Sequence, residues 1–380
     1  MKTDQQGDTC TSIYDLASRM TAKEYRTGGT TLESTDTYTY DAASRVLSTQ
    51  KGRYDITTEH TYADDSMPLT ETLIADGRTY TATRNYDAAN RAESHTFPSG
   101  ESANWSYDAR DVVTTVHYED QLVTTNTHDA GYRLTGQSFG NGLTRNINYG
   151  RQDNLRTLDR VFKGNQAIGD LNLSYNYAAD KQITAENIVG DVLTDTSFTA
   201  NYDAGNRITS WSRAGNNPVT NNQTWNYDDA GNWNSTTTTV GNQTSTENRN
   251  YNAADGITNI AGNATTQDLK GNLTEFEIDG KEYDVVNYDL DNRINKVDVD
   301  GTDVEYRYDA MGRRVLRKES NTTTALIWWG NSECSEHKHQ AGQTVIQNDI
   351  FDHPSRLNAV VARAVAVSYT HLTLPTKRIV

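Results

Sequence analysis

The sequence lacks several features that would point to a particular class of protein. Only Cys10 and Cys334 occur, too few and too far apart in sequence to predict a disulfide framework. No apolar run approaches the length of a membrane span, and residues 1–20 contain no hydrophobic signal region. Lysine and arginine form no cluster, and the net charge is −16. We therefore expect no binding to nucleic acid or to anionic membranes, which requires basic surface.

Large apolar side chains are also scarce. Counted without tyrosine and with glycine, the apolar fraction is about 35%, against about 45–50% in ordinary globular domains. The mean hydropathy is −0.80, so a thick core is not expected. Disorder is not expected either, because the chain contains 22 tyrosines and its bulky and polar residues alternate strictly. This balance favours a single curved sheet with one modestly apolar face, stabilised by cross-strand contacts of tyrosine and threonine.

What the sequence has in abundance is a repeated phrase of tyrosine, aspartate, two or three small residues and usually arginine. It reads YDLASR at Tyr14, YDAASR at Tyr40, YDAANR at Tyr86, YDAGNR at Tyr202, YDLDNR at Tyr288 and YDAMGR at Tyr308. The copies headed by Tyr86, Tyr107, His128 and Tyr149 follow one another at intervals of 21 residues. A repeat of this length predicts one supersecondary element per copy.

The stretches between the phrases indicate which element this is. Leu171, Leu173, Tyr175 and Tyr177 alternate with polar residues, a period of two that predicts a strand ending at the phrase. Pairs that favour two-residue hairpin loops with positive φ lie about midway between phrases, namely Asp76-Gly77, Asn141-Gly142, Asp279-Gly280 and Asp300-Gly301. The sequence therefore predicts an all-β repeat array of antiparallel β-hairpins that forms a continuous curved or spiralling sheet.

The phrase itself suggests a structural role for each of its residues. We expect the aspartate to accept backbone N–H bonds as the chain leaves the strand, and Ser44, Asn206 and Gly312 to adopt a left-handed turn conformation. The arginine, as at Arg207 or Arg313, is expected to pair with an aspartate of its own or an adjacent copy, forming a ladder along the stack. The alternative is a set of solvated turn charges worth well under ~1 kcal/mol each.

The phrase and its spacing resemble those of the YD-repeat, or RHS-repeat, family, and YDAMGRRVLRKE at Tyr308 is a close match. The resemblance divides the chain into a repeat array over residues 11–320 and a post-repeat β segment of the shell over residues 321–365. Residues 366–380 abandon the repeat and resemble a translated sequencing-adapter tail, so we expect a non-native or disordered tail. Both ends lack a capping element, which predicts that the terminal hairpins associate through exposed edges.

The resemblance also implies a function. In that family the repeats form a strip of sheet that spirals into a shell, and bacterial shells often enclose a variable C-terminal toxin. The leading hypothesis is thus a non-catalytic, secreted scaffold for a toxin or effector domain that this chain does not contain. The family's D-P-x-G self-cleavage region is not matched by Asp352-His353-Pro354, so self-cleavage is not expected. The alternative is a cell-surface or wall-associated adhesion module that binds carbohydrate through Trp211, Trp225 and Trp233.

No residue is predicted to be catalytic, to bind a cofactor or to bind a metal. The sequence contains no G-x-S-x-G elbow, no H-E-x-x-H and no phosphate-cradling glycine loop, so we predict a non-enzyme. Two clusters offer metal-ligating side chains without a recognised spacing. They are Cys334, His337 and His339 with Glu336 or His353, and Asp298, Asp300 and Asp303 around Gly301. A polar loop and an Asp-Gly hairpin explain the same residues.

Overall fold

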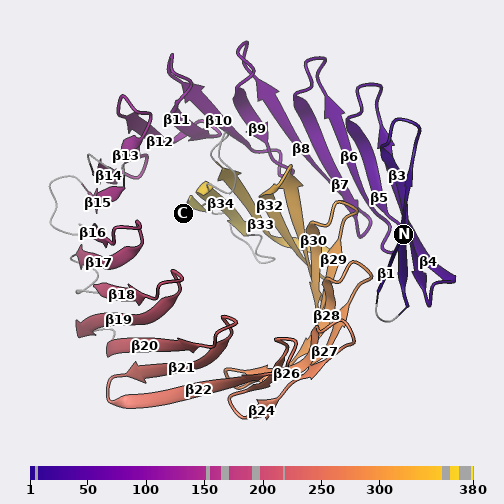
Figure 1. Ribbon diagram of the computed structural model, residues 1–380. Coiled ribbons are helices and arrows are strands. Elements are labelled where there is room, and N and C mark those ends of the chain that lie inside the picture. The colour runs from indigo at the N-terminus through magenta and orange to yellow at the C-terminus, as the bar shows by residue number, and fades with distance from the viewer. Residues whose placement is uncertain are drawn as a thin grey trace. The chain divides into compact units, whose positions relative to one another are not determined.

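The structure is a computed structural model that describes residues 1–4, 7–150, 155–163, 171–190, 197–216, 219–352, 360–367 and 378–379. All regular elements of the described residues are β-strands (Figure 1). The chain divides into two compact units, one made of Met1–Trp105 with Thr266–Val380 and the other of Ser106–Thr265. The predicted all-β class is therefore confirmed.

The first unit contains two runs of consecutive strands. The N-terminal run comprises β1 (Lys2–Thr3), β2 (Thr9–Tyr14), β3 (Met20–Thr27), β4 (Thr31–Tyr40), β5 (Val46–Lys51), β6 (Ile56–Tyr62), β7 (Pro68–Ala75), β8 (Arg78–Tyr86), β9 (Ala92–Thr96) and β10 (Ser102–Tyr107). The C-terminal run comprises β25 (Thr266–Gln267), β26 (Leu273–Ile278), β27 (Lys281–Tyr288), β28 (Ile294–Val299), β29 (Thr302–Tyr308), β30 (Arg314–Glu319), β31 (Thr322–Trp329), β32 (Ser332–Gln340), β33 (Gln343–Asp352), β34 (Val360–Val367) and β35 (Arg378–Ile379). Within each run, every strand pairs antiparallel with the next one.

The second unit contains one run of strands. It comprises β11 (Val113–Tyr118), β12 (Gln121–His128), β13 (Leu134–Phe139), β14 (Thr144–Tyr149), β15 (Arg156–Phe162), β16 (Leu171–Tyr177), β17 (Ile183–Gly190), β18 (Phe198–Tyr202), β19 (Ile208–Asn216), β20 (Val219–Tyr227), β21 (Trp233–Val240), β22 (Gln243–Tyr251), β23 (Ile257–Ile260) and β24 (Asn263–Ala264). Here too each strand pairs antiparallel with its neighbour in sequence. The hairpin repeat predicted from the sequence is thus present in both units.

The predicted two-residue turns are correct in three cases out of four. Both residues of Asp76-Gly77, Asp279-Gly280 and Asp300-Gly301 have positive φ, between 51° and 79°. The prediction is wrong for Asn141-Gly142, where only Gly142 is left-handed. That pair lies in a longer loop, closed by the amide of Phe139 donating to the carbonyl of Leu143 at 2.8 Å. Phe139 occupies the loop position that the aspartate has in a repeat phrase, and the Asn141 side chain, two positions later, accepts the Leu143 amide at 3.1 Å.

The sheet surfaces carry the threonine contacts that the composition predicted. Hydroxyl pairs bridge neighbouring strands on exposed faces, at 2.7 Å for Thr61 and Thr70 and at 3.0 Å for Thr237 and Thr246. The boundaries at residues 320 and 365 remain predictions, although hairpin pairing continues through β31, β32 and β33. Residues 368–377 and 380 of the predicted tail lie outside the described residues.

Candidate functional site

The repeated phrase forms the same small loop in both units. In the copy at Tyr202, the amide of Asp203 donates to the carbonyl of Arg207 at 2.9 Å, and Asp203 Oδ1 accepts the Gly205 and Arg207 amides at 2.8 and 2.9 Å. The fourth loop position is left-handed, as predicted, with φ of 66° at Ser44 and 63° at Asn206. A short polar side chain tolerates this conformation because it can bond to the local backbone.

The phrase arginine pairs with the aspartate of its own copy, one of the two partners that the ladder hypothesis allowed, and in several copies it also reaches the next copy. Arg45 Nε donates to Asp41 of its own copy, and Arg45 Nη1 donates to the carbonyl of Ala63 in the next copy at 2.7 Å. Its guanidinium lies 4.8 Å from the ring centroid of Tyr62, which heads that copy. The copy at Tyr62 has Ala63 in place of the aspartate, but Arg19 likewise donates to the backbone carbonyl of Asp41 in the next copy, at 3.0 Å. An adjacent copy is thus reached through its backbone and its tyrosine ring. Hydrogen bonds from the Arg45 backbone and side chain hold the pKa of Asp41 below its usual range.

The phrase tyrosine links its copy to the preceding one, whereas the arginine reaches the next copy. The sequence analysis did not predict this role of the tyrosine. Its hydroxyl donates to the backbone carbonyl that follows the loop of the preceding copy, at 2.7–3.0 Å. The pairs are Tyr40 to Met20, Tyr62 to Val46, Tyr86 to Pro68, Tyr149 to Leu134, Tyr177 to Arg156, Tyr202 to Ile183, Tyr227 to Ile208, Tyr251 to Trp233, Tyr288 to Leu273 and Tyr308 to Ile294. The excess of 22 tyrosines over 6 phenylalanines was the signal that a hydroxyl is required.

The first unit contains a second feature, which we call the seam. It is the set of contacts between the N-terminal run and the C-terminal run, and strands β7 and β31 are in contact there. At one point along the seam, Lys51 Nζ lies 2.8 Å from Asp36 Oδ2 and 3.1 Å from Asp291 Oδ2. The Tyr25 hydroxyl donates to the same Asp291 oxygen at 2.7 Å. Burial opposes ionisation of Asp291, but hydrogen bonds from Lys23 and Tyr25 and the charge of Lys51 outweigh it and lower its pKa.

A second group of the seam extends one repeat phrase. Arg313 pairs with Asp309 of its own loop and also with Glu71, which projects from β7. Glu71 accepts the Gly330 amide at 2.7 Å, and Arg313 donates to the Gly330 carbonyl at 2.6 Å. The Asp309 side chain is 0% exposed and that of Arg313 is 10% exposed. The same phrase forms a more exposed loop at Asp203 and Arg207, whereas here it is part of a buried ion network.

A third group of the seam consists of histidines and aromatic rings. The Tyr80 hydroxyl lies 2.7 Å from His339 Nε2, and the ring of His337 meets Tyr80 edge-on with centroids 5.3 Å apart. His95 packs edge-on against Trp329, with centroids 5.2 Å apart. Burial lowers the pKa of His337 to about 4 and that of His95 well below its ordinary value. These histidines therefore act as neutral packing residues at pH 7.

The side chains of the two candidate metal clusters do not converge on a common point. Among the described residues, no group of three histidine, cysteine, aspartate or glutamate side chains is placed to hold a metal ion. Both ring nitrogens of His339 contact hydroxyls, and Glu336 accepts a bond from Asn348. His353 lies outside the described residues. Asp298, Asp300 and Asp303 have different partners, namely the Gly301 amide, the Glu282 amide and Lys296.

The three tryptophans of the adhesion hypothesis are half-buried on their strands. Arg249 lies 3.8 Å from the ring centroid of Trp233, and Arg213 lies 5.4 Å from that of Trp211. These contacts occupy ring faces that a sugar would need. Stacking within the sheet therefore accounts for two of the three rings.

Comparison with known proteins places the chain in a family. A family model of the teneurin YD-shell matches residues 140–337, more than half of the chain. No curated protein shows significant sequence similarity. Among the described residues, no helix has the length and apolarity needed to cross a membrane.

Several solved structures share the fold. TcdB2-TccC3 without its hypervariable C-terminal region has a TM-score of 0.77 and 14% identity, covering 99% of this chain and 22% of that one. TcdB2-TccC3-Cdc42 has a TM-score of 0.75 and 13% identity, covering 97% and 21%. TcdB2-TccC3 has a TM-score of 0.74 and 14% identity, covering 98% and 22%. The chain thus spans about a fifth of the length of these proteins, and at such identities they show the fold alone. With the family match, the repeat array identifies the chain as a member of the teneurin YD-shell family.

Proposed function

We propose that this chain is a non-catalytic wall segment of a secreted shell that surrounds a toxin or effector domain encoded C-terminal to it. The observation that carries the proposal is the ladder of phrase contacts: the arginine binds the aspartate of its own copy and the backbone of the next copy, and the tyrosine binds the backbone of the preceding one. Such a ladder extends a sheet by repetition and commits its most regular polar residues to holding the wall together.

The surface chemistry fits a container better than a tight binding partner. Hydrophobic residues make up 34% of the chain and the net charge is −16, so most of the wall is polar and acidic. A polar lining surrounds a folded domain without adhering to it strongly, because only apolar burial and well-placed polar groups give high affinity. One matched structure is of TcdB2-TccC3 without its hypervariable C-terminal region, so that protein has a hypervariable region at its own C-terminus.

The test is protection of the downstream domain in the complete protein. We expect the C-terminal domain of the full-length protein to resist protease at concentrations that digest the same domain expressed alone. A full-length variant carrying Tyr→Phe substitutions at Tyr40, Tyr62 and Tyr86, which breaks three steps of the ladder, should lose part of that protection. Equal digestion of the domain with and without the repeat array would contradict the proposal.

A further inference from the structure

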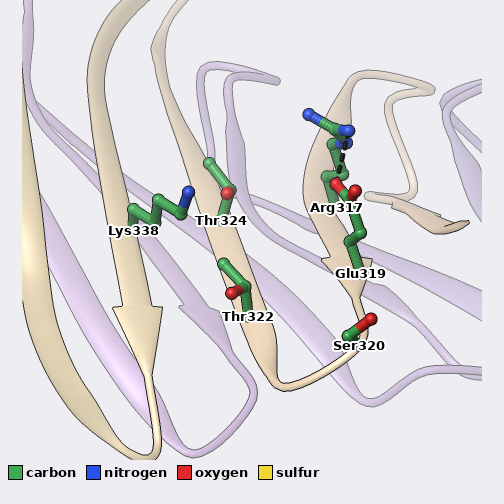
Figure 2. Close-up of a pocket in the computed structure, with 6 residues that line it drawn as sticks. All are labelled: Arg317, Glu319, Ser320, Thr322, Thr324 and Lys338. Carbon is green, nitrogen blue, oxygen red and sulfur yellow. Dashed lines mark hydrogen bonds and ion pairs between the residues drawn. The ribbon is translucent and has the colours of Figure 1, made fainter.

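A small polar pocket lies on strands β30, β31 and β32 of the first unit (Figure 2). Its volume is about 250 Å³, and it is lined by Arg317, Glu319, Ser320, Thr322, Thr324 and Lys338. This is just below the range of about 300–1,000 Å³ typical of small-molecule sites, and therefore suits side chains of a peptide. Figure 2 shows Thr322 and Thr324 between Lys338 on one side and Arg317 with Glu319 on the other.

Strand register explains why these side chains converge. Arg317 pairs with Thr324, and Thr324 pairs with Lys338, so the three form one row across the sheet. Glu319 pairs with Thr322 in the parallel row next to it. Neighbouring rows on one face lie about 7 Å apart along the strands, the distance between alternate residues of an extended chain.

The pocket is rich in donors that have no partner. In the part of the chain that the structure describes, no hydrogen bond or ion pair involves the Lys338 ammonium or the hydroxyls of Ser320, Thr322 and Thr324. Only Arg317 is engaged, by Glu319 at 2.5 Å. Because this pair is neutral overall, the free ammonium leaves the pocket with a net positive charge within a chain of net charge −16. A basic, hydroxyl-lined hollow of this kind matches a carboxylate, which accepts hydrogen bonds from both groups.

We propose that this pocket binds the carboxylate side chains of an extended acidic peptide. The two donor rows match alternate side chains of a strand-like ligand, whereas a single small anion fills only one row. Glu319 competes with the ligand for Arg317 and keeps the affinity modest. In the shell the peptide would belong to the enclosed domain, a step that rests on the proposed function; the pocket's affinity for acidic peptide does not rest on it.

The experiment titrates this chain with a short peptide of alternating aspartate and serine, its asparagine counterpart, and inorganic phosphate. We expect the aspartate peptide to bind with a dissociation constant between micromolar and millimolar. The asparagine peptide should show no binding in this range, and phosphate should bind at least about tenfold more weakly than the aspartate peptide. Lys338→Met should weaken peptide binding about tenfold, since hydrogen bonds to charged groups contribute that much. Glu319→Gln should tighten it several-fold by releasing Arg317.

Lys281→Met is the matched control, because Lys281 is an exposed lysine of the same unit with no ion pair in the described residues and its loss changes net charge equally. Thermal unfolding of each variant reports whether it remains folded, and Thr324→Val provides a second variant that conserves volume and charge.

If Lys338→Met and Lys281→Met reduced the affinity for the aspartate peptide equally, the pocket would not be its binding site. Equal affinity for phosphate and the aspartate peptide would overturn the peptide as its ligand. The peptide titration does not depend on the protease-protection assay. The pocket can therefore bind peptide even if the shell proposal fails, and the shell proposal can hold even if the pocket binds no peptide.

Discussion

The two units share one repeat and differ in what that repeat is packed against. In the first unit, twenty-two described hydrophobic residues are buried, against seven in the second. Nine buried residues of the first unit are aspartate, glutamate, lysine or histidine, against Asp159 alone among the described residues of the second. The phrase ladder is the same in both. The seam therefore supplies the first unit with a second layer, and with it both apolar burial and buried charge.

One phrase makes the comparison quantitative. The Asp309 and Arg313 side chains are 0% and 10% exposed, whereas those of Asp203 and Arg207 in the second unit are 24% and 41% exposed. Both pairs have the same spacing in sequence and the same loop. What differs is Glu71, which β7 brings to Arg313 from across the seam. Identical local sequence can thus form a surface ion pair or a buried network, depending on a partner more than two hundred residues away.

The largest effect should come from removing the arginine at the buried copy. Arg313→Met leaves Glu71 and Asp309 buried without a counter-charge, which typically costs about 3–5 kcal/mol. Arg207→Met, the matched substitution in the second unit, should cost about 1 kcal/mol or less because its partner is solvated. Hydrogen exchange of β7 and β31 compared with β18 and β19 measures both. Similar losses in the two units would show that the seam adds nothing to this pair.

The second prediction concerns pH and again separates the units. His95 and His337 are buried with lowered pKa values in the first unit, while no described histidine of the second unit is buried. Because the unfolded chain binds these protons at higher pH than the folded chain does, the contribution of both histidines to stability is complete above about pH 6.5 and falls as the pH is lowered. For His337 the loss extends down to about pH 4. For His337 this amounts to about 3 kcal/mol.

The groups around the histidines support the same sign. Arg84 faces His95 and lowers its pKa further, and Arg78 and Asp76 act on His339 in opposite directions after the larger effect of burial. The pKa of Asp291 is lowered, so its contribution to the stability of the fold is lost only when the pH falls below the ordinary pKa range of aspartate. Between pH 6.5 and 4 the histidines therefore make the largest contribution to the change in stability of the first unit. Hydrogen exchange corrected for pH should show selective opening of β8, β9 and β32, and His337→Phe should reduce it. Uniform opening of both units would argue against the histidines as the cause.

The phrase loops and hairpins were predictable because their causes are local. The aspartate, the left-handed fourth position and the Asp-Gly turns all act within a few residues, and the structure agrees at Ser44, Asn206 and Gly77. The prediction at Asn141-Gly142 was wrong because the pair lies in the third and fourth positions of a five-residue loop from Phe139 to Leu143, and the dipeptide alone does not distinguish that loop from a two-residue turn.

The seam was not predictable in the same way. Lys51 and Glu71 sit on strands where a polar residue is normally solvated, and nothing near them in sequence indicates Asp291 or Arg313 as partners. His337 and His339 attracted attention as possible metal ligands, yet their neighbour is Tyr80, whose sequence separation from them exceeds 250 residues. Lys51 and Thr49 lie on the same buried face of β5, and because both residues are polar their spacing does not indicate from sequence that the face is buried.

The third prediction tests what the two units share. Tyr86→Phe in the first unit and Tyr227→Phe in the second each remove a hydroxyl that donates to a backbone carbonyl, at 2.9 and 2.8 Å. Each should cost about 1 kcal/mol, the usual net value of such a bond. Chemical denaturation monitored by hydrogen exchange within each unit provides the measurement. A large difference between the units would mean that the ladder does not contribute equally to both.

The smallest effect is the coupling within an exposed phrase pair, and it decides between the ladder and a set of solvated turn charges. A double-mutant cycle of Asp203→Asn and Arg207→Met isolates the interaction across their 2.7 Å contact. Exposed pairs usually give about 0.2–1 kcal/mol, and salt should reduce the value because it screens exposed charges. Arg207 also lies 4.7 Å from the ring centroid of Tyr227, a contact that Asp203→Asn leaves in place. If the single Arg207→Met substitution destabilises the second unit while the coupling energy is zero, the arginine stabilises the wall through tyrosine and backbone contacts, and the aspartate serves only to shape the loop.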